Sequence, residues 1–166
     1  MWVDEPSYFR AELPWTDGLP AAYREMWGGE FPMDQIYLLF LDGEGCETVR
    51  LRFWRTVLRL IQHAYFASVR DFCHQNGLWF SGHLMREDRM ESQIRATCFT
   101  MPLYKYIDVP GIDYLTAQMN WRHGEIKQAV PYETGWSEFG EFVTPLQCSS
   151  AAHQNGSELI LAEMYG

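Results

Sequence analysis

The sequence predicts an α/β protein in which short parallel strands alternate with helices, and three observations support this class. The 166 residues are 47% hydrophobic and 16% aromatic against 21% charged, a balance that excludes a disordered chain. Short apolar runs alternate along the chain with segments of helical periodicity. The order of these segments is strand, helices, strand, helix, strand, helix, strand. This order is typical of parallel β/α units.

Four short apolar runs are the expected strands: residues 2–4, 78–84, 106–109 and 159–162. The first run stops at Glu5 and Pro6, and the third leads into Pro-Gly-Ile-Asp at 110–113. The last run ends at Glu163. Each expected strand therefore ends in a segment that contains polar residues.

Periodicity and capping residues predict helices at residues 19–27, 33–41, 47–75, 91–98 and 144–153. The longest, 47–75, has an apolar stripe with a 3.6-residue period and ends at Asn76 and Gly77. Thr144 and Pro145 are expected to open the last helix, because proline suits the first helical position. Residues 116–143 show no regular pattern and are interpreted as a loop excursion within a single domain.

Charge and motif content exclude several classes of function. The net charge is −9 and Lys and Arg form no cluster, which argues against nucleic acid or an anionic membrane as partner. No apolar run approaches the roughly 18 residues of a membrane span, and residues 1–6 show no signal-peptide pattern. Nucleotide-binding glycine motifs and closely paired cysteines are absent from the sequence. The cellular location is not indicated by this chain.

Three glutamates, Glu5, Glu87 and Glu163, lie at or just beyond the carboxyl end of an expected strand. In an α/β barrel the active site is built at these ends. Two carboxylates there can divide the work, one protonating a leaving oxygen and the other attacking or activating water. His83, also at a strand end, is suited to hydrogen-bonding a substrate hydroxyl. His83 and Glu87 are four residues apart, as in a helical metal motif, but no second histidine lies in register with them. The alternative for each glutamate is a solvated loop residue.

Aromatic side chains near the strand ends could stack on a sugar face. The candidates are Trp2, Trp15, Trp79 and Tyr165. The alternative for each is core packing, and it has most weight for Trp79 because that residue lies inside an expected strand.

Six short motifs occur in a fixed order along nearly the whole chain. They are Asp-Glu-Pro at 4–6, Leu-Pro-Trp-Thr at 13–16, Gly-Leu-Trp-Phe-Ser-Gly-His-Leu-Met-Arg-Glu at 77–87, Val-Pro-Gly-Ile-Asp at 109–113, Gln-Cys-Ser-Ser-Ala-Ala-His-Gln at 147–154 and Ala-Glu-Met-Tyr-Gly at 162–166. This set resembles the catalytic barrel of bacterial glycoside hydrolases, in particular the α-L-rhamnosidase family (glycoside hydrolase family 106) and its uncharacterised relatives. Two departures are the long segment 116–143 and Leu146, which stands where the family commonly has lysine.

The resemblance implies a partial (β/α)8 barrel of about four β/α units, since a whole barrel needs about 250 residues. The remainder would belong to a longer parent chain, secreted or periplasmic. The resemblance also implies that Glu5 is the general acid, Glu163 the base or nucleophile and Glu87 an assisting residue. The substrate-binding residues would be Asp4, His83, Asp113, Trp15 and Tyr165. A calcium ion near the sugar is also implied, with ligands that the sequence does not identify.

The function expected from the sequence is therefore hydrolysis of a glycosidic bond in a polysaccharide or oligosaccharide. The alternative is a non-catalytic carbohydrate-binding or structural fragment of such a barrel. A metal-dependent hydrolase is a third class.

Overall fold

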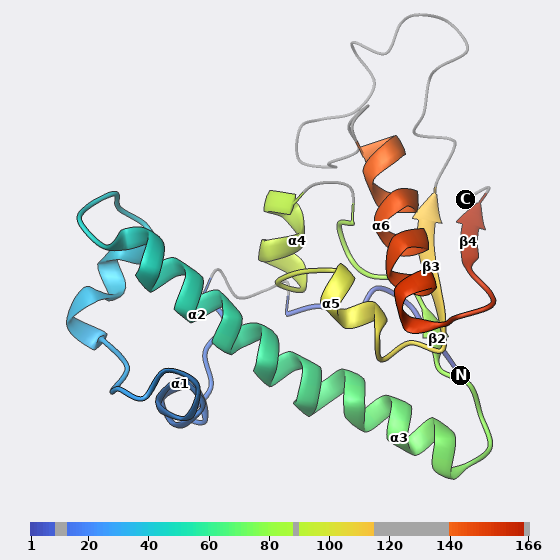
Figure 1. Cartoon of the computed structure of the whole chain (residues 1–166), viewed down its shortest axis with the longest axis horizontal. Coiled ribbons are helices and arrows are strands. Elements are labelled where there is room, and N and C mark those ends of the chain that lie inside the picture. Colours follow the sequence, from blue (N-terminus) through green and yellow to red (C-terminus); the bar gives the residue numbers. More distant parts are fainter. Residues whose placement is uncertain (9–12, 88–89, 115–139, 165–166) are drawn as a thin grey trace, which may run out of the picture.

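The computed structural model describes residues 1–8, 13–87, 90–114 and 140–164, in which parallel strands alternate with helices (Figure 1). The strands are β1 (Trp2–Val3), β2 (Ser81–Gly82), β3 (Val109–Tyr114) and β4 (Leu161–Met164). They form one four-stranded sheet in the order β1-β2-β3-β4, and every pair is parallel. The predicted α/β class is therefore confirmed.

The strands differ in extent from the predicted runs. Of residues 78–84 only Ser81–Gly82 is in the sheet, because the preceding backbone groups bond elsewhere. The N–H of Leu78 donates to the carbonyl of Cys73 at 2.8 Å, and that of Phe80 donates to the Asp108 carboxylate at 2.8 Å. β4 begins later than predicted, so Glu163 lies inside the strand rather than after it.

Several helices connect β1 to β2. They are α1 (Leu19–Trp27), the 3-10 helix η1 (Met33–Leu39), α2 (Cys46–Ile61), the π-helix η2 (Gln62–Ala67) and α3 (Ser68–Gln75). The last three follow one another directly, which confirms the long helix predicted over 47–75. The π turn in its middle was not predicted; such turns occur often near functional sites.

The helices after β2 are α4 (Met90–Ala96), α5 (Met101–Tyr104) and α6 (Gly140–Asn155). The short helix α5 was not predicted. The predicted start of the last helix at Thr144 is wrong, because α6 begins at Gly140 and Pro145 lies within it. Most of the expected loop, residues 116–139, lies outside the described residues.

The buried apolar side chains form two clusters. One packs α3, α5 and α6 against the sheet and includes Phe66, Phe80 and Tyr104. The other joins α1 to α2 and includes Leu19, Phe31 and Phe53. Figure 1 shows α1 and α2 extending to one side of the part that contains the sheet. Among the helices of the described ranges, none has the length and apolar character needed to cross a membrane.

A glycine fixes the contact between the first two strands. Gly82 has φ +155°, and a Cβ there would lie 2.0 Å from the carbonyl oxygen of Val3. Only glycine avoids that clash. Val3 pairs with Gly82 in register, so the residues that follow them, Asp4 and His83, emerge side by side.

Candidate active site

The carboxyl ends of all four strands bring polar side chains together. Asp4 and Glu5 directly follow β1, and His83 directly follows β2. Asp113 in β3 and Glu163 in β4 are register partners. We call these five residues the strand-end cluster. Parallel strands present their carboxyl ends at the same edge of the sheet, so residues far apart in sequence meet there.

His83 is at the centre of the strand-end cluster and is only 1% exposed. Its Nε2 lies 2.9 Å from Oε2 of Glu163 and 3.2 Å from Oδ1 of Asp4. The indole of Trp2 meets the imidazole edge-on, with ring centroids 5.4 Å apart. Nδ1 of His83 is buried and has no hydrogen-bond partner among the described residues. The imidazole is therefore fixed between two carboxylates that come from the two edge strands.

Glu5 is partly buried and has an unusual backbone. Its φ is +43°, in the left-handed region that residues other than glycine seldom adopt. Burial raises the pKa of Glu5; the neighbouring His83 opposes this rise, and the other carboxylates of the strand-end cluster add to it. Strained backbone of this kind is frequent at active sites. A carboxyl with a raised pKa keeps its proton to higher pH and is suited to general-acid work.

Asp113 is also protonated more readily than an ordinary aspartate. Burial raises its pKa, His83 opposes the rise, and the carboxylates of Glu163 and Asp4 add to it. Its Oδ1 is buried without a hydrogen-bond partner in the described part of the chain. The strand-end cluster thus combines carboxyls of raised pKa with the exposed carboxylate of Glu163.

Glu87 lies behind the strand-end cluster and is 4% exposed. Its carboxylate accepts hydrogen bonds from the N–H of Leu84 and from the hydroxyl of Tyr104, the latter at 3.3 Å. Burial raises the pKa of Glu87 well above its ordinary value, and these hydrogen bonds lower it in part. The contacts make Glu87 a support for the turn that follows His83.

A polar network that sequence reasoning missed holds this turn from the other side. Nε2 of Gln93 donates to the backbone carbonyl of Glu87 at 2.8 Å and to Oε1 of Gln147 at 2.7 Å. The hydroxyl of Thr100 donates to the same Gln147 oxygen at 3.1 Å. These residues come from separate elements, and no local pattern in the sequence signals that they meet.

The predicted aromatic platforms lie in different places. Trp2 borders the strand-end cluster through its contact with His83. Trp15 packs edge-on against Phe31 and lines an apolar cavity of about 630 Å³ beside α1 and α2. Trp79 precedes β2, at the opposite, amino end of the sheet. Tyr165 lies outside the described residues.

Two sets of side chains in the strand-end cluster could hold a metal ion, and both use His83. One is Asp4, His83 and Glu163, and the other is Glu5, His83 and Asp113; within each set the ligand atoms lie within 4.8 Å of one another. Calcium prefers six to eight oxygen ligands. Here Nε2 of His83 lies between the carboxylates of Asp4 and Glu163, so neither of these two sets fits an all-oxygen calcium site. The mixed nitrogen and oxygen set is of a type that transition metals accept.

Comparison with models of known protein families gives no match to this chain, and comparison with curated proteins gives no significant match. The resemblance to glycoside hydrolases therefore depends on the short motifs alone. The geometry of the strand-end cluster is the remaining evidence for function.

Proposed function

We propose that the strand-end cluster is the catalytic site of a glycoside hydrolase that acts on a polysaccharide or oligosaccharide, with α-L-rhamnosides as the first substrates to test. The observation that carries the proposal is the pairing of two unlike carboxyls. Glu5 is partly buried with a raised pKa, whereas the Glu163 side chain is 46% exposed and bonded to His83. Acid-assisted glycoside cleavage needs one protonated and one ionised carboxyl at the same bond.

In this mechanism Glu5 donates its proton to the glycosidic oxygen as the bond from that oxygen to the anomeric carbon breaks. Glu163 either removes a proton from the attacking water or itself bonds the anomeric carbon, after which water releases the sugar. His83 holds the Glu163 carboxylate at 2.9 Å and limits its movement. Asp4, at 3.2 Å from the same nitrogen, is left with exposed oxygen atoms that can accept hydrogen bonds from sugar hydroxyls. No step requires a metal ion.

We further propose that the four strands are half of a (β/α)8 barrel whose remainder belongs to a longer parent chain. The two edge strands support this, because each exposes apolar side chains. Trp2 on β1 is 45% exposed and Leu161 on β4 is 43% exposed. Exposed apolar edges of a parallel sheet are normally covered or paired. Further strands on both sides would cover them.

The test is a screen of rhamnosyl, galactosyl, glucosyl and arabinosyl 4-nitrophenyl glycosides with the longer parent chain that completes the proposed barrel, as wild type, Glu5→Gln and Glu163→Gln. We expect wild-type hydrolysis of at least one glycoside and a loss of about 10²- to 10⁴-fold in kcat/KM in each variant. Glu44→Gln is the matched control, since Glu44 is exposed and outside the strand-end cluster. The wild-type rate should fall as the pH rises through the raised pKa of Glu5, because the acid is then ionised.

Three results would contradict the proposal. An inactive wild type that still binds sugars would favour the non-catalytic carbohydrate-binding fragment. Unchanged activity in the Glu5→Gln, Glu163→Gln double variant would place catalysis elsewhere. Metal found by elemental analysis, together with activity lost in chelator and restored by that metal, would favour a metal-dependent hydrolase.

A further inference from the structure

The amino end of the sheet has a cavity of its own, separate from the strand-end cluster. Its volume is about 290 Å³, near the lower limit of ligand pockets. The segment before β2, the start of β3 and the turn between α6 and β4 form its walls. The side chains that line it include Trp79, Lys105, Asn155, Ser157 and Glu158. We call this the amino-end cavity.

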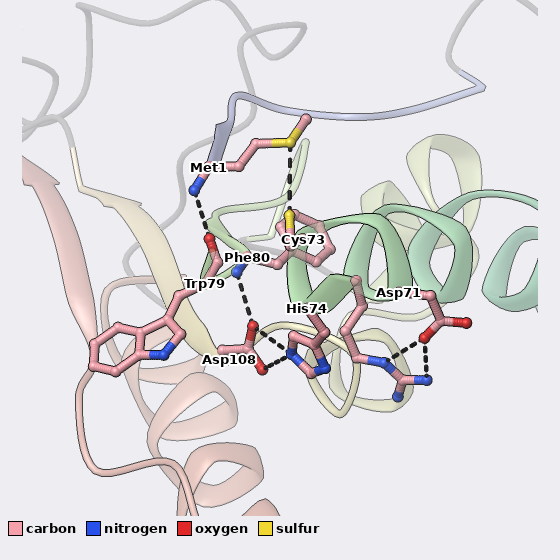
Figure 2. Close-up of polar contacts among 8 residues, drawn as sticks. Met1, Asp71, Cys73, His74, Trp79, Phe80 and Asp108 are labelled. Carbon is pink, nitrogen blue, oxygen red and sulfur yellow. Dashed lines mark hydrogen bonds and ion pairs between the residues drawn. The ribbon is translucent and has the colours of Figure 1, made fainter. Parts of the chain in front are cut away.

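Trp79 provides an aromatic surface at this cavity. It is 65% exposed, although sequence reasoning offered a core position as its alternative. In Figure 2 the backbone carbonyl of Trp79 takes part in the bonded network, accepting from the Met1 amino group, and the indole lies to one side of it. The indole N–H has no hydrogen bond to any residue of the described part. What distinguishes Trp79 from other exposed aromatic residues is its place in the lining of this cavity, where its ring and its indole N–H are both open to a ligand.

Several polar side chains of the amino-end cavity have no hydrogen-bond partner among the described residues. In the described ranges, the Asn155 amide, the Ser157 hydroxyl and the Glu158 carboxylate form no hydrogen bond or ion pair. The Lys105 ammonium lies 4.8 Å from the ring centroid of Tyr106 and bonds to no carboxylate within the part of the chain that the structure describes. The exposed indole of Trp79 is therefore surrounded by hydrogen-bond donors and acceptors. They include one cationic, one anionic and two neutral side chains.

The cavity wall beneath these groups is fixed. Asp108, which also lines it, accepts from the Phe80 N–H at 2.8 Å and contacts Nε2 of His74 at 2.9 and 3.1 Å (Figure 2). Val109 and Ile107 are buried in the same wall. The site is therefore formed before a ligand arrives, which lowers the entropy cost of binding.

We propose that the amino-end cavity is a second, non-catalytic binding site for a saccharide, in which a sugar ring stacks on the Trp79 indole. A sugar ring has an apolar C–H face that matches an indole. Its hydroxyls each donate and accept, so they suit a wall with both kinds of partner. A phosphate or a carboxylate ligand fits less well, because Glu158 and Asp108 are acidic and Lys105 is the single cation among the lining residues. The site lies at the end of the sheet opposite to the strand-end cluster, so it would hold a polymer without blocking catalysis.

The test measures binding without turnover, by native gel electrophoresis through arabinoxylan, xyloglucan, galactan or rhamnogalacturonan, in the Glu5→Gln background. We expect at least one polysaccharide to retard the protein, and Trp79→Ala to weaken that retardation about tenfold in apparent Kd. Trp79→Tyr should keep part of the affinity, and the double variant Lys105→Met, Asn155→Ala should lose most of it. Phe40→Ala is the control, because Phe40 is a comparably exposed aromatic residue outside the cavity.

Retardation by none of the polysaccharides would overturn the proposal, as would equal retardation of the parent and Trp79→Ala. Loss of binding in Phe40→Ala to the same degree would indicate non-specific adsorption and would also overturn it. Thermal unfolding of each variant checks that the fold is kept. The result is independent of the proposed hydrolase activity, since binding in an active-site variant neither needs nor reports turnover.

Discussion

Carboxylates at the two ends of the sheet differ in whether their oxygen atoms have bonding partners. At the amino end, both oxygens of Asp108 contact Nε2 of His74, and one of them also accepts from the N–H of Phe80. At the carboxyl end, Oδ1 of Asp113 and Oε2 of Glu87 are buried without a partner among the described residues. Burial also raises the pKa of Asp113 and Glu87.

This difference separates an acid whose two oxygens both have partners from acids that are buried with one oxygen unpaired. A carboxylate whose hydrogen-bonding capacity is used stabilises the fold, and removing it leaves its donors unpaired. A carboxyl that is buried with unused acceptors and raised pKa costs stability. Groups of the second kind are often kept at functional sites; here Asp113 belongs to the strand-end cluster and Glu87 supports the turn behind it. The comparison therefore predicts opposite signs for substitutions at the two ends.

The largest effect is expected from Asp108→Ala. The substitution leaves the Phe80 N–H without its acceptor and removes the contact with His74, so the free energy of unfolding should fall by about 2–3 kcal/mol. Urea denaturation measures the change. Asp42→Ala is the matched control, because Asp42 is 92% exposed and its ion pair with Arg50 should contribute almost nothing. Equal effects of the two substitutions would contradict the structural role of Asp108.

The strand-end cluster could be predicted because its residues share a topological position that the sequence pattern reveals. Glu5, His83 and Glu163 each follow or lie in an apolar run, and parallel strands bring such positions together. The bonding of Asp108 could not be predicted, because His74 and Phe80 contact it across 34 and 28 residues of sequence.

Two other differences between the sequence-based predictions and the structure arise from tertiary contacts, which the identity of a single residue does not indicate. Trp15 belongs to the apolar packing around α1, since Phe31 returns to meet it. Pro145 is a favourable first residue for a helix but is also accepted inside α6, at the cost of one backbone hydrogen bond. Local preference indicates where a helix can begin and does not determine where it does.

The next effect concerns pH and is expected from Glu87→Gln. The folded-state pKa of Glu87 is raised well above its unfolded value, so the wild type loses stability as the pH rises from about 4 towards the folded-state pKa. Glutamine can accept from the Leu84 N–H and the Tyr104 hydroxyl without ionising. We expect the variant to be more stable than the wild type by about 1–2 kcal/mol at pH 8. The difference should disappear below pH 4.

Thermal unfolding from pH 3 to pH 8 tests this prediction. Glu91→Gln serves as the control, because Glu91 is an exposed acid paired with Arg95 on α4. A stability difference that is the same at every pH would show that Glu87 is neutral, or ionised, over the whole range, and would contradict the account of its burial.

The smallest effect on the free energy of unfolding is expected from Glu5→Asn, and this substitution should stabilise the protein. Asparagine tolerates the left-handed backbone that Glu5 adopts at φ +43°, and it removes a carboxyl that Asp113, Asp4 and Glu163 repel. The free energy of unfolding should therefore rise by about 1 kcal/mol, while any hydrolase activity is lost. Glu5→Gln separates the two causes, because it removes the charge and keeps the backbone strain. A residue whose replacement stabilises the fold and abolishes turnover is retained for chemistry; if Glu5→Asn instead destabilises the protein, Glu5 belongs with Asp108 among the structural acids.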